Sequence, residues 1–276
     1  MSESTIGFLG PEGTFAHLAA QKRFGTRRPL VGFPTVKEVF DFVNGSPNRI
    51  GIAPIENSSG GTIYDTVDRL VDQSYDLFIQ ESLSINVRLA LIGQTKNRIR
   101  IIYSHFAPLQ HCEHWIRTHY PAAKCKETSS TAKAVQAAAL DPEAAAIGNR
   151  QAGKIYKLKI LEFPIAQDVP NVTQFFVLGH KRHPVQAGDR TTLIVSLHNK
   201  PGELVSFLEP FRDEGIDLTR IISRPIVGKP SSYVFLVDVK GALGDPHLQR
   251  ALKKAASASQ RMKSIGSYPI VKRYES

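Results

Sequence analysis

Short apolar runs alternate with segments of helical spacing along the first 180 residues. The apolar runs predict strands at 5–9, 50–55, 82–92, 99–103, 144–147 and 173–178. Apolar residues spaced by three and four predict helices at 14–24, 63–71, 111–120 and 131–140. Thr14 is a candidate N-cap for the first of these helices, and Ser130 or Thr131 for the last. Strands that alternate with helices are typical of an α/β domain with mostly parallel pairing.

A second unit follows a polar segment at 181–190, which contains proline and glycine and is predicted to be a linker. Beyond it, strands are expected at 191–197, 218–224, 232–239 and 266–271, with helices at 202–214 and 246–257. This βαββαβ order predicts a small ferredoxin-like domain. The chain therefore divides into a first domain at 1–180, the linker, and a second domain at 191–276.

Composition narrows the classes of function. The formal net charge is +10, from 35 basic and 25 acidic side chains, and no segment interleaves basic and aromatic residues as single-strand binders do. Nucleic acid is therefore not the expected partner, and a small anionic metabolite suits the positive field better. The apolar runs are far shorter than the roughly 20 residues of a membrane helix. With no leader-like N-terminus and only Cys112 and Cys125, the chain is expected in the reducing cytoplasm.

Two turns could bind an anion, because each follows a strand and leads into a helix. The first, at 10–15, places backbone N–H groups at a helix start, where the helix dipole also favours negative charge. The second contains Glu56, Asn57 and Ser58, and adds a carboxylate, an amide and hydroxyls. Each turn alone could simply cap a helix. Together they suggest a cleft that holds a dianion from both sides.

Further polar residues stand at strand ends. Ser104 and His105 follow the expected strand at 99–103, and Thr173 opens the strand at 173–178. The Thr173 hydroxyl is a poor acid, so it would act by hydrogen bonding to a leaving oxygen in a dry site, although a β-branched residue at a strand start needs no such role.

A zinc site is not expected from the histidines near Cys112. Only His111 and His114 share a helix face, and no second pair of ligands completes a tetrahedron. Cys112 lies beside Trp115 in the sequence and is expected to pack in the core.

Taken in order, several motifs resemble the prephenate dehydratase family. GPEGTFAH at 10–17, PIENSSGGTIYDTVDRL at 54–70, YSH at 103–105 with Cys112, and NVTQF at 171–175 resemble its catalytic domain. PGELVSFLEPFRDEGIDLTRIISRP at 201–225 resembles the ACT regulatory domain that follows it. The resemblance implies a two-lobed, type II periplasmic-binding-protein-like catalytic domain. It also implies an ACT unit that pairs in a homodimer or homotetramer and binds L-phenylalanine in many members.

The resemblance also assigns site residues. It implies catalytic roles for Thr173, His105 and Glu56, with no metal or cofactor. The implied substrate-binding residues are Thr14, Asn57, Ser58, Ser104, Gln174 and Phe175. The implied regulatory residues are Gly202, Leu204, Ser223, Arg224 and Pro225.

The chain departs from the family pattern at several positions. The family usually has arginine where this chain has Gln174, and often has glutamine where this chain has His111. Losing the guanidinium removes a charge-assisted hydrogen bond, which typically contributes about 1.5–3 kcal/mol, unless another cation compensates. Glu203 and Ile222 also differ from the usual ACT motifs, which bears on phenylalanine binding.

The implied reaction converts prephenate to phenylpyruvate, carbon dioxide and water. Its driving force is formation of the aromatic ring, so the protein must hold two carboxylates, assist the leaving hydroxyl and exclude water. Two alternatives stay open at this point. One is a decarboxylase that keeps the hydroxyl on a non-aromatic ring, and the other is a non-catalytic amino-acid sensor built on the ACT unit.

Overall fold

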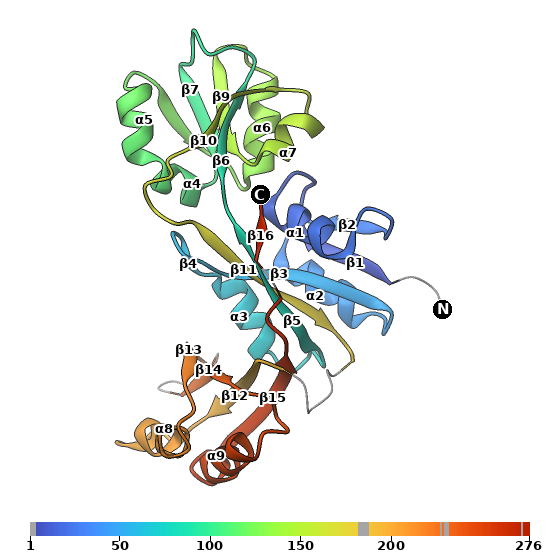
Figure 1. Ribbon diagram of the computed structural model, residues 1–276, viewed down its shortest axis with the longest axis vertical. Coiled ribbons are helices and arrows are strands. Elements are labelled where there is room, and N and C mark those ends of the chain that lie inside the picture. The colour runs from blue at the N-terminus through green and yellow to red at the C-terminus, as the bar shows by residue number, and fades with distance from the viewer. Residues whose placement is uncertain (1–3, 182–187, 227, 229–231, 272) are drawn as a thin grey trace.

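The computed structural model describes residues 4–181, 188–226, 228, 232–271 and 273–276. It consists of two α/β lobes and a third α/β unit that packs against the first lobe (Figure 1). Within the described residues, no helix is both long and apolar enough to cross a membrane.

The first lobe is built on a mixed sheet. Its parallel part comes from the start of the chain, in the order β1 (Thr5–Leu9), α1 (Phe15–Phe24), β2 (Leu30–Phe33), α2 (Val36–Asn44) and β3 (Arg49–Asn57). The sheet order is β2-β1-β3-β11-β5-β16, in which β5 (Phe78–Asn86) and β11 (Val172–Gly179) are antiparallel neighbours. The short strand β4 (Gly61–Thr62) pairs with β3 and leads into α3 (Tyr64–Val71).

The second lobe repeats this plan. Its parallel strands are β7 (Ile101–Ser104), β8 (Lys124–Glu127) and β9 (Ala144–Gly148), and its sheet order is β8-β7-β9-β6-β10. The antiparallel part comes from β6 (Leu89–Gly93) and β10 (Lys159–Ile165). The helices are α4 (Phe106–His111), α5 (Glu113–His119), α6 (Thr131–Ala139) and α7 (Arg150–Ile155). The matching strand orders confirm the expected two-lobed, periplasmic-binding-protein-like architecture.

The chain crosses between the lobes at two places, after β5 and after β10 (Figure 1). The first crossing corrects the prediction of one strand at 82–92. Val87 and Arg88 separate β5 from β6, and these strands belong to different sheets. The helix predicted at 111–120 is also divided, because α4 ends before Cys112 and α5 begins after it.

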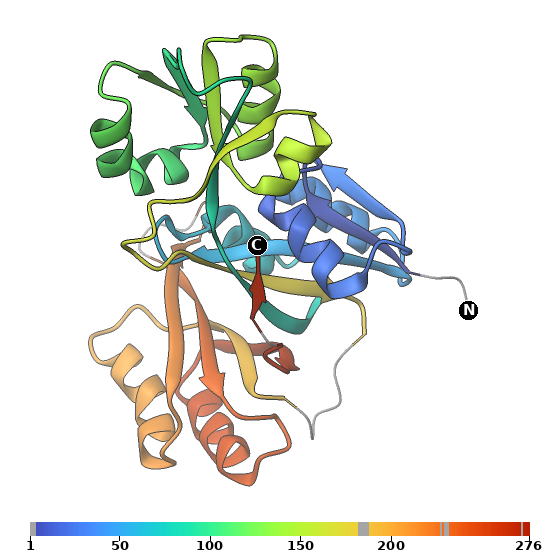
Figure 2. The same ribbon diagram turned by 45° about the horizontal axis from the view of Figure 1, so that its top comes forward.

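The third unit has the expected βαββαβ order. It runs β12 (Arg190–Ser196), α8 (Glu203–Asp213), β13 (Leu218–Pro225), β14 (Tyr233–Lys240), α9 (Pro246–Ser257) and β15 (Arg261–Tyr268), with sheet order β13-β14-β12-β15. Figure 2 shows α8 and α9 on the face of this sheet that points away from the first lobe. The other face packs on that lobe, where Tyr268 meets Phe176 edge to face with 5.7 Å between ring centroids.

The boundaries between units differ from the prediction at the C-terminal side. After β15 the chain returns to the first lobe, and β16 (Tyr274–Glu275) pairs in parallel with β5. The third unit therefore ends with β15 and not at residue 276. Of the linker predicted at 181–190, residues 182–187 lie outside the described part of the chain.

Candidate functional site

A cavity of about 230 Å³ lies between the two lobes. Both lobes line it, through the turn between β1 and α1, the end of β3, the start of β11, and the segments that enter α4 and α6. Five of the residues singled out from the sequence reach it, namely Thr14, Asn57, His105, Thr173 and Phe175. The fold thus brings together segments that are as distant in the sequence as Leu9 and Phe175.

Asn57 and Thr173 form a hydrogen-bonded pair at the cavity wall. They are register partners on β3 and β11. The Asn57 Oδ1 accepts the backbone N–H groups of Ser59 at 2.9 Å and Gly60 at 2.7 Å, so its Nδ2 is the atom that faces the cavity. That Nδ2 donates to Thr173 Oγ1 at 2.8 Å and to the Asn171 side chain at 2.8 Å. Because Thr173 accepts this bond, its own proton is available to another acceptor.

Among the described residues, four helices begin at the cavity, α1 and α3 from the first lobe and α4 and α6 from the second. Of these, α1 and α6 have an N-cap side chain that accepts a backbone N–H. Thr14 is the N-cap of α1 and accepts from the His17 N–H, as the sequence predicts. Ser130 is the N-cap of α6 and accepts from the Lys133 N–H at 3.1 Å. The first backbone N–H groups of each helix have no partner within the helix, so both starts present positive partial charge to the cavity. No lysine or arginine stands among the described residues that line it.

His105 is the titratable side chain among the described residues of the cavity wall. It occupies the N-cap position of α4, next to Phe106, with 4.8 Å between the ring centroids. Burial lowers the pKa of His105 below its ordinary value, and the nearby Glu127 carboxylate opposes that shift. In the unliganded protein this imidazole is therefore mostly neutral at pH 7.

Four of the predicted site residues lie outside the cavity wall. Side chains alternate along a strand, so Glu56 and Gln174 point away from the face that carries Asn57 and Thr173. Both contact Arg220 of the third unit instead. The Ser104 hydroxyl is buried and donates to the Ile147 carbonyl at 2.7 Å.

Ser58 has a local structural role in place of the predicted helix start. Its hydroxyl donates to the Pro170 carbonyl at 3.0 Å and accepts the Val172 N–H at 2.9 Å, which ties the β3 end to β11. The next helix, α3, starts only at Tyr64, after Ile63 at its N-cap position. Ile63 itself lines the cavity, so the start of α3 reaches it without Ser58 as its cap.

Direct contacts hold the lobes together beside the cavity. His111 of α4 bonds to the Ser59 hydroxyl at 3.0 Å and to the Ala166 carbonyl at 3.0 Å. Asn149, the N-cap of α7, donates to the Gly13 carbonyl at 2.6 Å. Polar contacts thus join the two lobes beside the cavity.

Sequence reasoning missed Asn171 and the α6 start as parts of this site. Asn171 was visible in the NVTQF motif, but only its contact with Asn57 shows a function for it. Ser130 was identified as a cap, yet nothing in the sequence placed α6 at the cleft. Cys112 packs as expected, and burial raises the pKa of its thiol to about 12.

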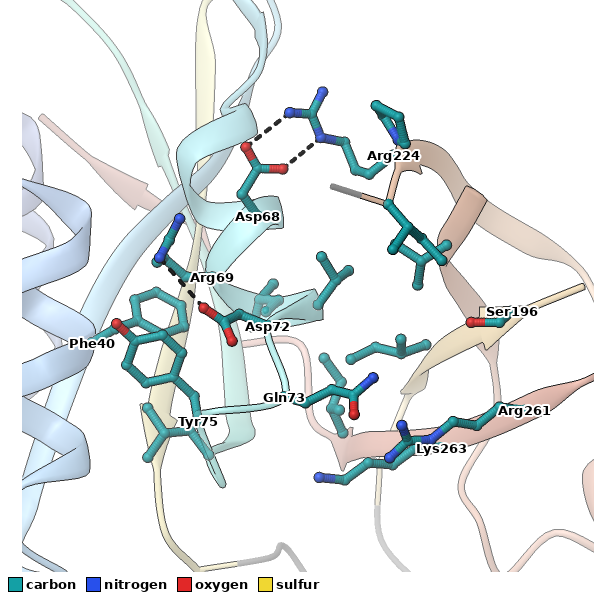
Figure 3. Close-up of a pocket in the computed structure, with 18 residues that line it drawn as sticks. Phe40, Asp68, Arg69, Asp72, Gln73, Tyr75, Ser196, Arg224, Arg261 and Lys263 are labelled. Atoms are coloured by element: carbon teal, nitrogen blue, oxygen red, sulfur yellow. Dashed lines mark hydrogen bonds and ion pairs between the residues drawn. The ribbon is translucent and has the colours of Figure 1, made fainter. Parts of the chain in front are cut away.

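A second cavity, of about 540 Å³, lies between α3 and the sheet of the third unit (Figure 3). Arg224 on β13 reaches across it to Asp68 on α3, with a bidentate ion pair at 2.5 and 2.8 Å. Of the residues predicted to be regulatory, Arg224 and Pro225 line this cavity. Gly202 is the N-cap of α8, Leu204 packs in the core of the third unit, and Ser223 is exposed on β13.

The fold and the site define a two-lobed α/β protein with a cavity of small-molecule size between its lobes and a third unit packed on one lobe. Comparison with known proteins agrees. The prephenate dehydratase family model matches residues 6–183, and the ACT domain model matches residues 191–257.

Individual relatives extend the match over nearly the whole chain. The bifunctional chorismate mutase/prephenate dehydratase of Pseudomonas aeruginosa is 35% identical over 266 residues, which cover 96% of this chain and 73% of that protein. The prephenate dehydratase of Arthrobacter aurescens in complex with L-Phe is 27% identical, with a TM-score of 0.87 over 96% of this chain and 90% of that one. The prephenate dehydratase of Staphylococcus aureus is also 27% identical, with a TM-score of 0.81 over 96% and 99%.

The chain belongs to the prephenate dehydratase family and carries a C-terminal ACT domain. It is a carbon–oxygen lyase that converts prephenate to phenylpyruvate in the biosynthesis of phenylalanine.

Proposed function

We propose that prephenate reacts in the interlobe cavity and that the Thr173 hydroxyl donates a hydrogen bond to the departing ring hydroxyl. The main support is the hydrogen bond from the Asn57 amide to Thr173 Oγ1. Because this bond uses the oxygen as an acceptor, the threonine proton is free to point at the substrate. Thr173 is 9% exposed, so this hydrogen bond forms away from bulk water, where it is strong.

The bond changes set what the other groups must do. The bond from the ring to its carboxylate breaks, and the electron pair enters the ring as carbon dioxide leaves. The carbon–oxygen bond opposite breaks with its electron pair, and that oxygen takes one proton to leave as water. His105 supplies this proton in our proposal, and the support is its position in the cavity wall. A bound dianion favours the imidazolium and so opposes the effect of burial on the pKa of His105.

The two carboxylates of prephenate must be held by positive partial charge, because no lysine or arginine stands among the described residues of the cavity wall. The starts of α1 after Thr14 and of α6 after Ser130 provide it from opposite lobes. Phe175, Phe15 and Ile63 supply apolar wall for the ring. Glu56, Ser58, Ser104 and Gln174 support the strands and loops around the cavity and do not touch the substrate.

Turnover of prephenate by the Thr173→Ala variant tests this assignment. The formation of phenylpyruvate is followed by its ultraviolet absorbance, and kcat is expected to fall about 100–1,000-fold while KM changes little. Thr173→Ser keeps the hydroxyl and is expected to retain most of the rate. A normal kcat in Thr173→Ala would show that this residue has no role in the chemical step.

The pH profile tests His105. If its imidazolium supplies the proton, kcat/KM falls as pH rises above the lowered pKa of the free enzyme, and His105→Gln removes that limb. A profile of unchanged shape in His105→Gln would assign the proton to water.

We propose that the ACT domain binds L-phenylalanine and that this ligand inhibits the dehydratase. A related structure is described as a complex with L-Phe. Gly202, Leu204, Ser223, Arg224 and Pro225 are the proposed regulatory positions. Phenylalanine should raise the melting temperature and lower prephenate turnover; heat stabilisation without inhibition would leave binding in place but reject the regulatory role.

The expected homodimer or homotetramer has support at the edge of the ACT sheet. β13 is an edge strand, and Ile221 on it is 46% exposed. Tyr233, on the neighbouring strand β14, is 47% exposed. An uncovered edge of this kind is suited to a second copy. Sedimentation of the parent chain and of Ile221→Lys should show a pair that the substitution weakens.

The cytoplasm remains the proposed location. Its support is the pair of free thiols, Cys112 and Cys125, of which Cys125 is exposed.

A further inference from the structure

A buried guanidinium joins the ACT domain to the strands of the active site. The side chain of Arg220, on β13, is 5% exposed. Its Nη2 donates to Glu56 at 2.8 Å and to Gln174 at 2.6 Å, and its Nη1 donates to Asp238 at 2.5 Å. Glu56 is on β3 and Gln174 on β11, so one side chain of the ACT domain bonds to both strands at once.

The contacted residues are the immediate neighbours of the proposed catalytic pair. Gln174 is the register partner of Glu56, as Thr173 is of Asn57. Alternation along the strands sends one cross-strand pair into the cavity and the other toward Arg220. A register irregularity between β3 and β11 follows directly after Gln174, where Ile55 of β3 has no partner on β11. The ladder is less regular there, and the guanidinium adds a fixed connection between the strands.

The ACT side of the connection is held firmly. Asp238 on β14 is fully buried and also accepts the Thr192 hydroxyl at 2.6 Å, and Thr192 shares a hydrogen bond with the Tyr268 hydroxyl at 2.7 Å. On the other side, Gln174 donates to the Ser82 hydroxyl of β5 at 2.7 Å. A network of buried hydrogen bonds therefore runs from the ACT sheet to the sheet of the first lobe.

We propose that Arg220 is a positioning residue for the dehydratase reaction, which holds Asn57 and Thr173 in register by bonding to Glu56 and Gln174. The inference rests on the proposed role of Thr173. It implies that the ACT domain completes the support of the active site, so a shift of β13 changes the rate of the chemical step. It also gives Glu56 an effect on turnover without contact with substrate.

The first test is Arg220→Lys in the full chain. Lysine keeps a cation beside Asp238, but its single nitrogen cannot bond to Asp238, Glu56 and Gln174 in the planar arrangement of a guanidinium. We expect kcat to fall about 10–100-fold, as for small misplacements of catalytic groups, with KM within about three-fold. An unchanged kcat would overturn the proposal. The matched control is Lys263→Met, which removes another ion pair across this interface, with Asp76 at 3.4 Å, and should leave kcat unchanged.

The second test is Glu56→Gln, which leaves the Arg220–Asp238 pair intact and so tests the proposal if Arg220→Lys folds poorly. It should lower kcat without altering the shape of the pH profile, and it should add little to the loss in Arg220→Lys. A further multiplicative loss in the double variant, or a missing limb in the pH profile, would make Glu56 a direct catalyst and overturn the proposal.

The third test moves the guanidinium. Gln174 Oε1 and Arg220 Nη2 are 2.6 Å apart, so Gln174→Arg combined with Arg220→Gln places the charge on β11 beside Glu56. We expect this pair of substitutions to recover part of the kcat that Arg220→Gln loses, and no recovery would count against the proposal. Thr173→Ala, measured beside these variants, distinguishes failure of the proposed reaction mechanism from failure of the positioning role. A normal kcat in Thr173→Ala rejects the mechanism. A large loss of kcat in Thr173→Ala together with a normal kcat in Arg220→Lys rejects only the positioning role.

Discussion

The amide of Asn57 donates to the hydroxyl of Thr173 at 2.8 Å, across the antiparallel strands β3 and β11. Two backbone N–H groups hold the other end of the Asn57 amide, so the direction of this bond is determined by the fold. A hydroxyl with one acceptor site occupied in this way is oriented before the substrate arrives, and orientation before reaction is the main source of electrostatic catalysis.

The first prediction concerns Asn57→Asp. A carboxylate still accepts the N–H groups of Ser59 and Gly60, but it cannot donate, so the Thr173 proton turns back toward it. We expect kcat to fall about 100–1,000-fold in a chain that folds normally. Steady-state kinetics with prephenate measure this, with the exposed Asn97→Asp as a control for the added charge. A rate near that of the parent would show that the direction of this bond is unimportant.

Two substitutions of Ser130 distinguish its role as the N-cap of α6 from a role of this helix start in substrate binding. Ser130→Ala loses the cap of α6 and should reduce the free energy of unfolding by about 1 kcal/mol. Ser130→Asp keeps a capping oxygen and suits the helix dipole, so stability should be retained. Its negative charge, however, would face the proposed dianion and raise KM about 10-fold or more. Thermal melting and kinetics distinguish the two effects; an unchanged KM in Ser130→Asp would place the substrate carboxylates elsewhere.

His111 tests the contact between lobes. The Ala166 carbonyl can only accept, so Nε2 carries the proton and Nδ1 accepts from the Ser59 hydroxyl. Alanine removes both bonds, each worth roughly 0.5–1.5 kcal/mol, and should raise KM by about 10-fold with a smaller change in kcat. The His111→Gln variant can restore one of these bonds, so its KM should lie between those of the parent and of His111→Ala. Equal KM values in all three proteins would mean that these bonds do not affect closure.

The pH dependence of stability follows from His17 and His105. Burial lowers the pKa of both below the ordinary value of 6.5, and a nearby carboxylate opposes the shift in each. The unfolded chain therefore binds more protons as pH falls below about 6.5. The stability that these neutral imidazoles contribute is complete above pH 6.5 and is lost as pH falls toward their lowered pKa values.

Melting temperatures between pH 8 and pH 5 measure this effect. The parent should lose stability over the acid part of the range, and a variant with glutamine at both positions should show a shallower decline. If the melting temperatures of the two proteins fall in parallel with pH, these histidines do not control the loss of stability in acid.

Much of the fold was readable from local pattern. The caps Thr14 and Ser130 and the apolar spacing after them predicted α1 and α6 closely, because these signals act within one helical turn. The break between β5 and β6 was not visible, since apolar residues continue through 82–92 and only tertiary pairing assigns the strands to different sheets. The helix α2 received no prediction, although Val36, Val39, Phe40 and Val43 have helical spacing and are buried.

The site was harder to predict than the fold. Motifs identified Asn57, Thr173 and His105, but neighbouring Glu56 and Asn57 are indistinguishable as candidates until the strand pairing shows which one faces the cavity. Arg220 lies within the ACT-like segment at 201–225, but its contact with Glu56 could not be predicted, because 164 residues separate the two and nothing in that segment indicates a contact with β3. The cation that the sequence lacks at position 174 thus reaches Gln174 from another domain.

The return of the chain into the first lobe gives the ACT domain two covalent attachments to one sheet. β11 precedes it and β16 follows it, and both strands flank β5. Truncation of the chain after Gly179 would therefore remove β16 from the catalytic sheet as well as the ACT domain. The backbone of β5 would then be an exposed edge that can pair with another molecule. A shortened enzyme of this kind should aggregate, whereas replacing the ACT domain by a short peptide that rejoins β11 to β16 would preserve the sheet.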